Sequence, residues 1–288
     1  MAVHIVTDST CDLSQNMIDD YHITVLPLYV QLGEKSFKDG LNITSEEIFT
    51  FVSENGSLPQ TMAVSAEDYK NCFAALREKY PDDDILCITI GSKLSECFQN
   101  ALEAAGAFQH IYAVDSMNLS TGLGQVVMTA AELAEEGKRA VEIKKYLETE
   151  IVPNVDASFI VDRLDYLYKG GRCSAVAALG ANLFRLKHCI AVKDGELKLI
   201  KRYRGSFESC VEQYVRDRLQ SRDDVQMHRI FITHSHTSRK SIQIAEENIR
   251  VRCKFEHIDE TNAGCTVCSH CGPNTLGVLF LRKYHACG

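Results

Sequence analysis

The feature that most constrains this sequence is the run 85–90, in which five of six residues are apolar and the sixth is a threonine. Three aspartates precede the run and Gly91 follows it, so it has the length and the borders of a strand. Because such a strand has no face for solvent, both faces must be covered, which is typical of a parallel sheet between layers of helices. The short strand-like segments 4–7 and 111–114 are likewise each followed by a helical pattern. The first half therefore predicts an α/β fold, a parallel sheet flanked by helices.

Helices in this half have identifiable starts. Thr44, with Glu47 three residues later, predicts a capped helix that runs to about residue 55. Ser65 opens another helix, whose apolar residues Tyr69 and Phe73 fall on one face. Further expected elements are helices over 14–21, 94–108 and 121–136 and an extended strand over 23–32, where a proline favours the edge of a sheet.

The second half follows a different pattern. Asp194-Gly195, between the predicted strands 188–192 and 197–203, is a strong hairpin signal. The other expected elements are strands at 158–161, 229–233, 254–258 and 278–281, helices at 206–221 and 238–249, and a small-residue helix from Ser174. Hairpins with long helices predict an α+β domain with a largely antiparallel sheet. With the boundary near 153–156, the predicted domains are 1–155 and 156–288.

Charge is unevenly divided between these halves. Residues 1–156 hold 10 Lys and Arg against 25 Asp and Glu, and residues 157–288 hold 21 against 14, so the two parts carry −15 and +7. The basic part could meet an anionic partner, or the two surfaces could be solvated independently. No apolar run reaches the roughly 18 residues of a membrane span, and no export signal opens the chain. We therefore expect a cytoplasmic protein whose 12 cysteines are reduced thiols.

No complete catalytic signature is present: the sequence contains no Walker loop, no G-x-G-x-x-G, no H-E-x-x-H and no G-x-S-x-G. The most informative stretches, 8–10, 91–95 and 115–116, are rich in hydroxyl groups and follow predicted strands. Ligands of open parallel sheets bind at the carboxyl ends of strands, where helix N-termini offer free N–H groups to an anion. Each stretch alone also fits a helix N-cap, but three at one sheet edge favour a binding site.

Two loops in the second half are further candidates. Residues 169–172 (Lys-Gly-Gly-Arg) place a fixed positive charge after a flexible turn. Residues 269–277 place His270 in a loop rich in Gly and Pro ahead of a buried strand. Such loops commonly present side chains to ligands, although either could equally be a solvent-facing turn.

A cysteine cluster raises the question of metal binding. Cys265, Cys268 and Cys271 have the spacing of thiolate ligands of zinc or of an iron–sulfur cluster. No fourth ligand has a matching spacing, although one could come from Cys253, His257 or Cys287. The sequence leaves metal binding by this cluster open.

Taken in order, short stretches along the whole chain resemble the DegV family, which includes the FakB-type fatty-acid-binding proteins of bacteria. The stretches that carry the resemblance are Val6–Leu13, Leu26–Leu28, Ser92–Ser95, Val114–Ser116, Leu167–Arg172 and His270–Pro273. Each is weak alone, but their order and spacing together are specific. The resemblance implies a two-domain α/β fold with a long-chain fatty acid buried in a tunnel between the domains.

The resemblance also implies a function. Family members present the carboxylate of the bound acid to a separate fatty acid kinase, which makes an acyl phosphate; they are carriers, not enzymes, and need no cofactor or metal. Carried over by motif, the carboxylate-binding residues are Thr61, Ser92, Ser95 and His270. Candidate contacts to the head group or to the partner are Asp8, Ser9, Thr10, Arg172 and Arg204. Neither nucleic acid nor a membrane span is implied, and transient contact with a membrane surface is left open.

This sequence departs from the family pattern in two places. Where the family has Thr-Ser-x-Pro-Ser, the chain reads Thr-Met-Ala-Val-Ser from Thr61. After Ser95 it continues Glu-Cys-Phe, where Gly-Thr-Tyr is usual. Both stretches keep the hydroxyl groups assigned to the carboxylate, and the added Met, Glu and Cys bear on chain-length preference and on the local acid–base environment.

Two other classes of function stay open at this stage. A serine hydrolase or acyltransferase acting on an acyl substrate could use Ser92 or Ser95 with His270 and Asp8, although the strained elbow that exposes such a serine is missing. A nucleic-acid-binding regulator would rest only on the basic second half, which contains no recognisable nucleic-acid-binding module.

Overall fold

The computed structural model describes residues 2–172 and 186–283. The strands are β1 (Val3–Asp8), β2 (Thr24–Leu26), β3 (Tyr29–Leu32), β4 (Lys35–Lys38), β5 (Gln60–Met62), β6 (Asp84–Thr89), β7 (Ile111–Asp115), β8 (Val155–Val161), β9 (Leu186–Lys193), β10 (Glu196–Arg204), β11 (Val225–Ser235), β12 (His257–Asn262) and β13 (Thr275–Arg282). The α-helices are α1 (Gln15–Asp20), α2 (Ser45–Asn55), α3 (Ala66–Lys79), α4 (Cys97–Ala105), α5 (Thr121–Glu135), α6 (Ala140–Tyr146), α7 (Asp165–Lys169), α9 (Phe207–Leu219), α10 (Arg239–Arg252) and α11 (Cys265–Cys271).

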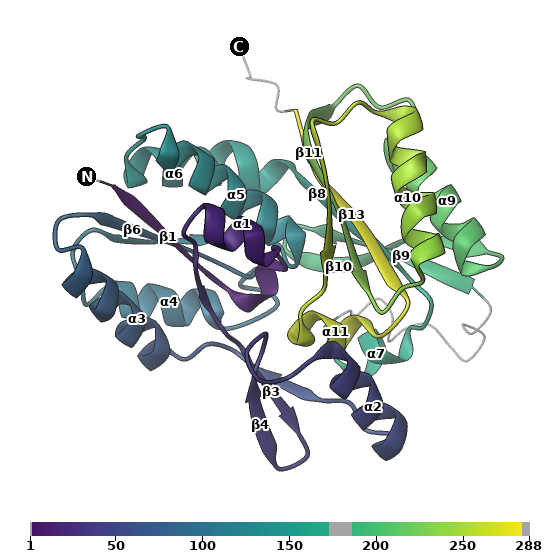
Figure 1. The fold of residues 1–288 in the computed structure, drawn as a ribbon, viewed down its shortest axis with the longest axis horizontal. Helices are drawn as coiled ribbons and strands as arrows, with labels where there is room; N and C mark the ends of the chain where they lie inside the picture. The colour runs from purple at the N-terminus through teal and green to yellow at the C-terminus, as the bar shows by residue number, and fades with distance from the viewer. Residues whose placement is uncertain (1, 173–185, 284–288) are drawn as a thin grey trace.

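The N-terminal sheet has the order β2-β1-β6-β7, and all of its pairs are parallel. Every residue of β6 is buried, as expected for the apolar run that anchors the sequence prediction. Helices α3 and α4 cover one face of the sheet, and α5 and α6 cover the other (Figure 1). The predicted α/β architecture of this half is confirmed.

The C-terminal sheet has the order β10-β9-β8-β13-β11-β12, and it is antiparallel except for the parallel pair β11–β12. The Asp194-Gly195 hairpin forms as predicted, with both residues at positive φ. Helices α9 and α10 pack side by side on the outer face of the sheet (Figure 1). The predicted, largely antiparallel sheet of the second half is therefore confirmed.

Helix α5 joins the two sheets. Its side chains pack against β1 in one sheet and against β8 and β13 in the other. The side chain of Gln125, near the middle of α5, donates to the backbone oxygens of Arg229 and Leu279. Ten residues of the helix are buried, because both of its faces are covered by protein. The chain crosses from the N-terminal sheet to the C-terminal sheet near residues 153–156, but one hydrophobic core includes residues from both sides of this crossing. The domain limits 1–155 and 156–288 therefore stay a prediction.

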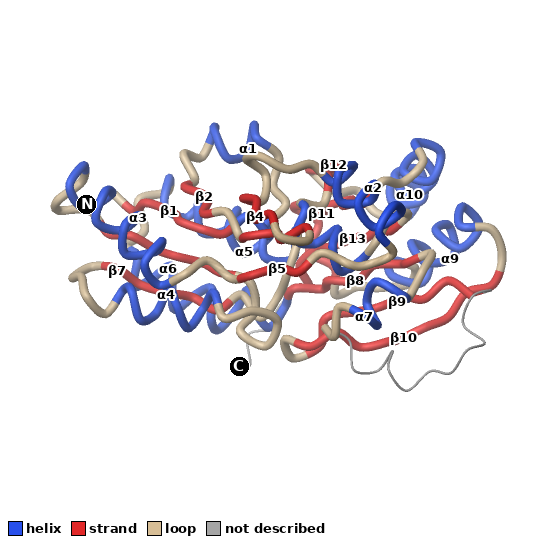
Figure 2. The backbone as a smooth tube through the Cα atoms, turned by 90° about the horizontal axis from the view of Figure 1, so that it is seen from below, coloured by secondary structure: helices blue, strands red, loops and turns tan. Residues whose placement is uncertain are grey.

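A small third sheet, β4-β3-β5, lies beside α11 of the C-terminal half. Seen from below, β4 and β5 lie between the strands of the N-terminal sheet on the left and those of the C-terminal sheet on the right (Figure 2). Val30 of β3, Ile48 of α2 and Cys265 of α11 share one buried cluster. Residues 28–62 thus extend from the N-terminal half to cover a helix of the C-terminal half.

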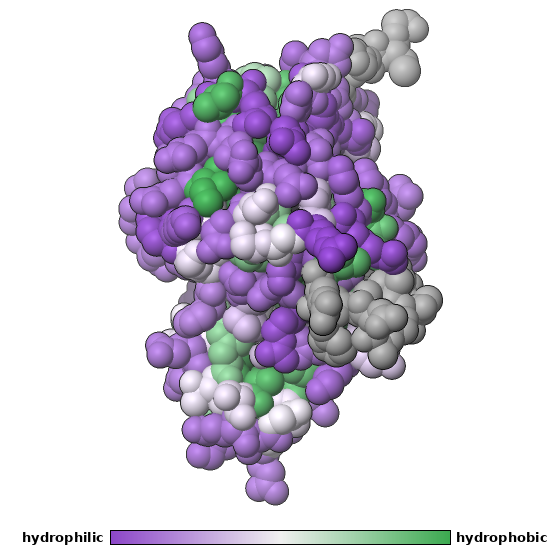
Figure 3. Space-filling model, turned by 90° about the vertical axis from the view of Figure 1, so that its right-hand side faces the viewer, coloured by the Kyte–Doolittle hydropathy of each residue, from purple (hydrophilic) through white to green (hydrophobic). Residues whose placement is uncertain are grey.

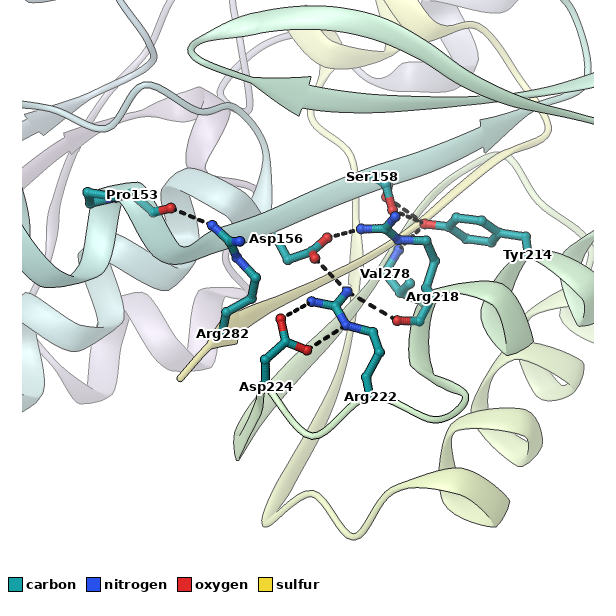
Figure 4. Close-up of polar contacts among 9 residues, drawn as sticks. All are labelled: Pro153, Asp156, Ser158, Tyr214, Arg218, Arg222, Asp224, Val278 and Arg282. Carbon is teal, nitrogen blue, oxygen red and sulfur yellow. Dashed lines mark hydrogen bonds and ion pairs between the residues drawn. The ribbon is translucent and has the colours of Figure 1, made fainter. Parts of the chain in front are cut away.

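An ion-pair network fastens α9 to β8 (Figure 4). Asp156 is buried and accepts hydrogen bonds from Arg218 and, at 2.7 Å, from Arg222. The Tyr214 hydroxyl donates to the backbone oxygen of Ser158 at 2.6 Å and accepts from the backbone N–H of Val278 at 3.0 Å. These bonds fix the outer helix layer to the two central strands of the C-terminal sheet.

Three predicted elements differ from the structure. The expected strand 23–32 is broken at Pro27, because proline has no N–H for a strand ladder, and its halves β2 and β3 belong to different sheets. The expected helix 94–108 begins only at Cys97, since residues 91–96 form a turn. The expected strand 254–258 lies at 257–262 as β12. The helix expected from Ser174 lies outside the described residues.

The described surface is largely polar. The face in Figure 3 is mostly hydrophilic, with its hydrophobic side chains in small, separate groups. Of the helices described, none has both the length and the apolar character needed to cross a bilayer.

Candidate functional site

The candidate site is a cavity of about 540 Å³ lined by residues of both halves of the chain. The first half contributes the turn after β6, strand β5 and Thr10 in the middle of η1 (Ser9–Cys11). The second half contributes α11, the end of α7 and parts of β8 and β10. Its lining residues are Thr10, Leu28, Thr61, Met62, Ala63, Ile90, Ser92, Lys93, Leu94, Ser95, Glu96, Leu119, Phe159, Leu167, Arg172, Leu197, Thr266, Val267, His270 and Cys271.

The four residues predicted to bind a carboxylate all line this one cavity: Thr61 on β5, Ser92 and Ser95 in the turn after β6, and His270 in the last turn of α11. His270 therefore lies on a short helix rather than in the loop expected from its Gly and Pro neighbours. Of the candidate further contacts, Thr10 and Arg172 line the cavity, whereas Asp8, Ser9 and Arg204 are not among its lining residues.

Thr61 and His270 meet across the two halves of the chain. The Thr61 Oγ1 atom lies 2.8 Å from His270 Nε2. The other ring nitrogen, Nδ1, is buried and has no hydrogen-bond partner among the described residues. Burial, together with the nearby charge of Arg172, lowers the pKa of His270 to about 4. The imidazole is therefore neutral near pH 7, and the pair offers hydrogen-bonding groups to a ligand without a formal charge.

Two glycines allow His270 to lie in this place. A Cβ atom on Gly170 would come within 2.7 Å of His270 Nδ1, so only glycine lets the end of α7 approach the ring this closely. Gly272 follows α11 with φ +76, and a Cβ there would come within 2.7 Å of the Tyr166 ring. Gly170 of Lys-Gly-Gly-Arg and Gly272 of His-Cys-Gly-Pro thus allow α7 to pack closely against α11.

The turn after β6 presents the two serines. The backbone N–H groups of Leu94 and Ser95 donate to the Gly91 oxygen at 2.9 and 3.2 Å, which closes the turn. The Ser92 N–H donates to Asp115 Oδ1 at 3.1 Å. Ser95 Oγ accepts from the Cys97 N–H at 3.3 Å and donates to its sulfur at 3.2 Å. The Ser95 hydroxyl is therefore committed to the turn before α4. The N-cap of α4 is Glu96, without a side-chain cap, so the helix-cap interpretation of Ser95 is not confirmed.

Asp8 has a structural role at the edge of the sheet. Its carboxylate accepts from the Thr10 N–H at 3.1 Å, from the Thr10 hydroxyl, and from the Ile90 N–H at 2.8 Å. It thereby ties the end of β1 to the end of β6. Burial raises the pKa of Asp8 to about 6. Because its hydrogen bonds lie within the protein, Asp8 is not available to orient His270.

Two further carboxylates hold the N-terminus of α11, and sequence reasoning missed this role. Asp39 accepts from the Cys265 and Thr266 N–H groups at 2.7 and 3.0 Å. Asp12 accepts from the Gly264 N–H at 2.8 Å and from the Ser120 hydroxyl. Both satisfy N–H groups that a helix start leaves unpaired. A weak signal was available, since Asp12 lies inside the first stretch of the resemblance.

A second, smaller and almost wholly apolar cavity adjoins the first. It is lined by Leu119, Ser120, Ala157, Ser158, Phe159, Val192, Thr233, His234, Ser235, Ala263, Val267, Cys271, Thr275, Gly277 and Leu279. Leu119, Phe159, Val267 and Cys271 line both cavities. An apolar path therefore leads from the polar group of Thr61 and His270 towards the C-terminal sheet.

The cysteines of α11 do not converge on one point. The Cys265 thiol donates to the Ile43 oxygen, that of Cys268 to the Ala263 oxygen, and that of Cys271 to the Gly272 oxygen. Within residues 2–172 and 186–283, no third ligand joins two of these thiols at metal-binding distance. Cys287, one of the suggested fourth ligands, lies outside the described residues.

Comparisons with known proteins agree with this architecture. A family model described as "Uncharacterised protein, DegV family" matches residues 2–283. A DegV domain-containing protein of Clostridium acetobutylicum is 33% identical over 98% of this chain and 99% of its own length. A fatty acid-binding protein of Thermotoga maritima is 29% identical over 96% of each chain.

Solved structures extend the similarity to three dimensions. A DegV-family protein of Thermus thermophilus, described for its fatty acid binding, matches with a TM-score of 0.87 and 30% identity over 98% of this chain and all of its own. A DegV lipid-binding protein of Thermotoga maritima matches with a TM-score of 0.85 and 27% identity over 98% of this chain and 99% of its own.

Proposed function

This chain belongs to the DegV family, and from that premise we propose that it binds a long-chain fatty acid, with the carboxylate beside Thr61 and His270 and the acyl chain along the apolar path between the two halves. The observation that carries the proposal is the convergence of the four motif-derived residues on one cavity that continues into an apolar one. A volume of about 540 Å³ is within the usual range for a small-molecule site.

The acyl chain supplies most of the affinity in this proposal. Burial of one methylene is worth about 0.8 kcal/mol, so some fifteen methylenes offer on the order of 12 kcal/mol before the costs of binding. The residues common to both cavities, Leu119, Phe159 and Val267 among them, are the surface against which the chain would pack.

The carboxylate fixes the orientation of the ligand. A buried carboxylate is costly unless several donors meet it. The Thr61 hydroxyl, the neutral His270 ring and the Ser92 hydroxyl provide such donors. The Ser95 hydroxyl adds another by turning from the Cys97 sulfur to the carboxylate, and Arg172 adds a positive charge at the rim. In this arrangement the ligand carboxylate takes the hydrogen bond that Thr61 and His270 otherwise share.

We further propose that the protein is a cytoplasmic carrier that presents the carboxylate to a fatty acid kinase, which forms the acyl phosphate. Arg172 and Lys93 are exposed at the cavity and belong to a rim that suits an acidic partner. Association should then slow steeply as salt rises, because complementary charge acts on the association rate. A rate that is equal at low and high ionic strength would contradict this part of the proposal.

The geometry favours binding over serine-based hydrolysis. A serine nucleophile needs a base whose second nitrogen is held by a further group. His270 Nδ1 has no such partner among the described residues, and the Asp8 carboxylate bonds to Thr10 and Ile90 instead. Stoichiometric labelling of Ser92 or Ser95 by a fluorophosphonate would favour the hydrolase.

The direct test is ligand extraction. Mass spectrometry of the denatured protein should detect a long-chain fatty acid released in stoichiometric amount, and delipidated protein should take up one equivalent of palmitate or oleate. A protein that carries none and takes up none would overturn the proposal.

A further inference from the structure

A second cluster of ligand-bearing side chains lies outside the cavity, at the start of the parallel pair β11–β12. His228 of β11, Glu256 just before β12 and His257, the first residue of β12, each offer one ligand atom, and these atoms lie within 4.8 Å of one another. Among the residues that the structure describes, this is the one group of three histidine, cysteine or acidic residues so arranged. Along β11, His228 lies six residues, or about 20 Å, from His234, which lines the smaller of the two cavities.

We propose that His228, Glu256 and His257 form a binding site for a divalent transition-metal ion, with Zn²⁺ as the best match. Two imidazoles and one carboxylate are a ligand set that zinc takes in proteins, with water in the fourth position. Magnesium and calcium prefer sites made of oxygen ligands alone, so the two ring nitrogens select against them.

The distances permit a metal with only side-chain movement. His228 Nδ1 lies 2.8 Å from Glu256 Oε2, and the two histidine rings stand edge to face with centroids 5.3 Å apart. Ligand atoms around a tetrahedral zinc are separated by about 3.3 Å, which follows from bond lengths near 2.05 Å. Glu256 is 69% exposed and His257 is exposed as well, so both can adjust by rotation while the strands stay in place.

A further carboxylate supports His228 from behind. Its second ring nitrogen, Nε2, lies 3.4 Å from Glu132 Oε1 of α5. That same oxygen accepts from Arg229 at 2.8 Å, and the buried Arg229 side chain also bonds to Asp259. Metal-binding histidines usually donate their other N–H to a carboxylate in this way, which fixes the tautomer and the orientation of the ring. Glu132 is thus a positioning residue for His228.

The local charge also suits a cation. Glu132, Glu256 and Asp259 bring three carboxylates to the cluster, and Arg229 offsets one of them. The remaining negative charge would be offset by a divalent ion. The proposal is independent of fatty-acid binding, since none of the three ligands lines either cavity.

Zinc titration of tag-free, chelator-treated protein, followed by calorimetry, tests the site. Wild type should bind one equivalent of Zn²⁺. Glu256→Gln and His257→Gln should each weaken binding at least tenfold, and Glu132→Gln should weaken it about 10- to 100-fold through loss of the supporting carboxylate. His110→Gln is the control, because the exposed His110 lies 3.3 Å from the buried Asp84 and belongs to no group of three ligand residues within the described part of the chain. The zinc affinity of this variant should equal that of wild type.

Cobalt distinguishes this site from the thiols of α11. Co²⁺ in the proposed site should give visible bands without the intense sulfur-to-metal charge-transfer absorption of a thiolate complex, and Glu132→Gln should alter these bands. Fatty-acid uptake by His257→Gln should match wild type, so a failure of the metal site is distinguishable from a failure of the proposed function. Absence of zinc binding, binding that survives both ligand substitutions, or thiolate charge transfer would each overturn the proposal.

Discussion

Replacement of Thr61 by valine isolates the head-group contact, because valine keeps the shape of threonine and removes only the hydroxyl. In the structure this hydroxyl lies 2.8 Å from His270 Nε2. In the proposed complex it donates to a carboxylate, and a hydrogen bond to a charged group is worth about 1.5–3 kcal/mol against about 1 kcal/mol for a neutral pair. The substitution affects both states, so the binding free energy should fall by the difference, about 0.5–2 kcal/mol.

Such a loss corresponds to a roughly 2- to 30-fold weaker Kd for a long-chain fatty acid. Calorimetry with delipidated protein measures it, with the fatty alcohol of equal chain length as the comparison ligand. The alcohol carries no charge, so its affinity should fall less. Thr149→Val is the matched control, since Thr149 is exposed and its hydroxyl bonds only to the Lys145 oxygen. Unchanged affinity for the acid in Thr61→Val, or an equal loss for acid and alcohol, would refute the assignment of the head-group site.

Three other substitutions test the supports of this site. Asp39→Asn removes a charged cap from α11. It should lower the free energy of unfolding, measured by urea titration, by about 1 kcal/mol, and it should also weaken fatty-acid binding. Gly170→Ala forces its Cβ against His270 and should weaken fatty-acid binding while far-UV circular dichroism is unchanged. Burial raises the pKa of Asp12 to about 8. Its contribution to the free energy of unfolding is therefore full below the unfolded pKa near 4 and is lost as pH rises through 8. In Asp12→Asn, the free energies of unfolding at pH 5 and pH 8.5 should differ less than they do in wild type.

The regular elements could be predicted where one local pattern decides them. The run 85–90 required a strand covered on both faces, and the capping boxes at Thr44 and Ser65 fixed the starts of α2 and α3. The prediction of one strand over 23–32 was wrong because its apolar residues belong to two different sheets. No local signal in the sequence indicates that the chain changes sheet at Pro27. Short elements such as β4, β5 and α11 depend on tertiary contacts, which local propensity does not encode.

The site shows the same division between local and long-range information. The resemblance named Thr61, Ser92, Ser95 and His270, and the structure brings all four to one cavity. The family stretches did not indicate that Asp39 caps a helix more than 220 residues later in the sequence. That contact exists only once β3 and α2 lie against α11, so it could not be found from spacing or composition.

Helix α11 shows why stretches far apart in the sequence act together. Its N-terminus is held by Asp12 and Asp39 from the first half, and its C-terminus carries His270, which meets Thr61 from the same half. The position of the imidazole therefore depends on carboxylates at the opposite end of its own helix. Asp12 follows β1 of the parallel sheet after the short helix η1, and Asp39 directly follows β4 of the small sheet. Asp12 and Asp39 thus maintain the geometry of the proposed head-group site, and neither lines the cavity. Their conversion to amides should alter affinity only through α11, which separates them from Thr61 and His270 in function.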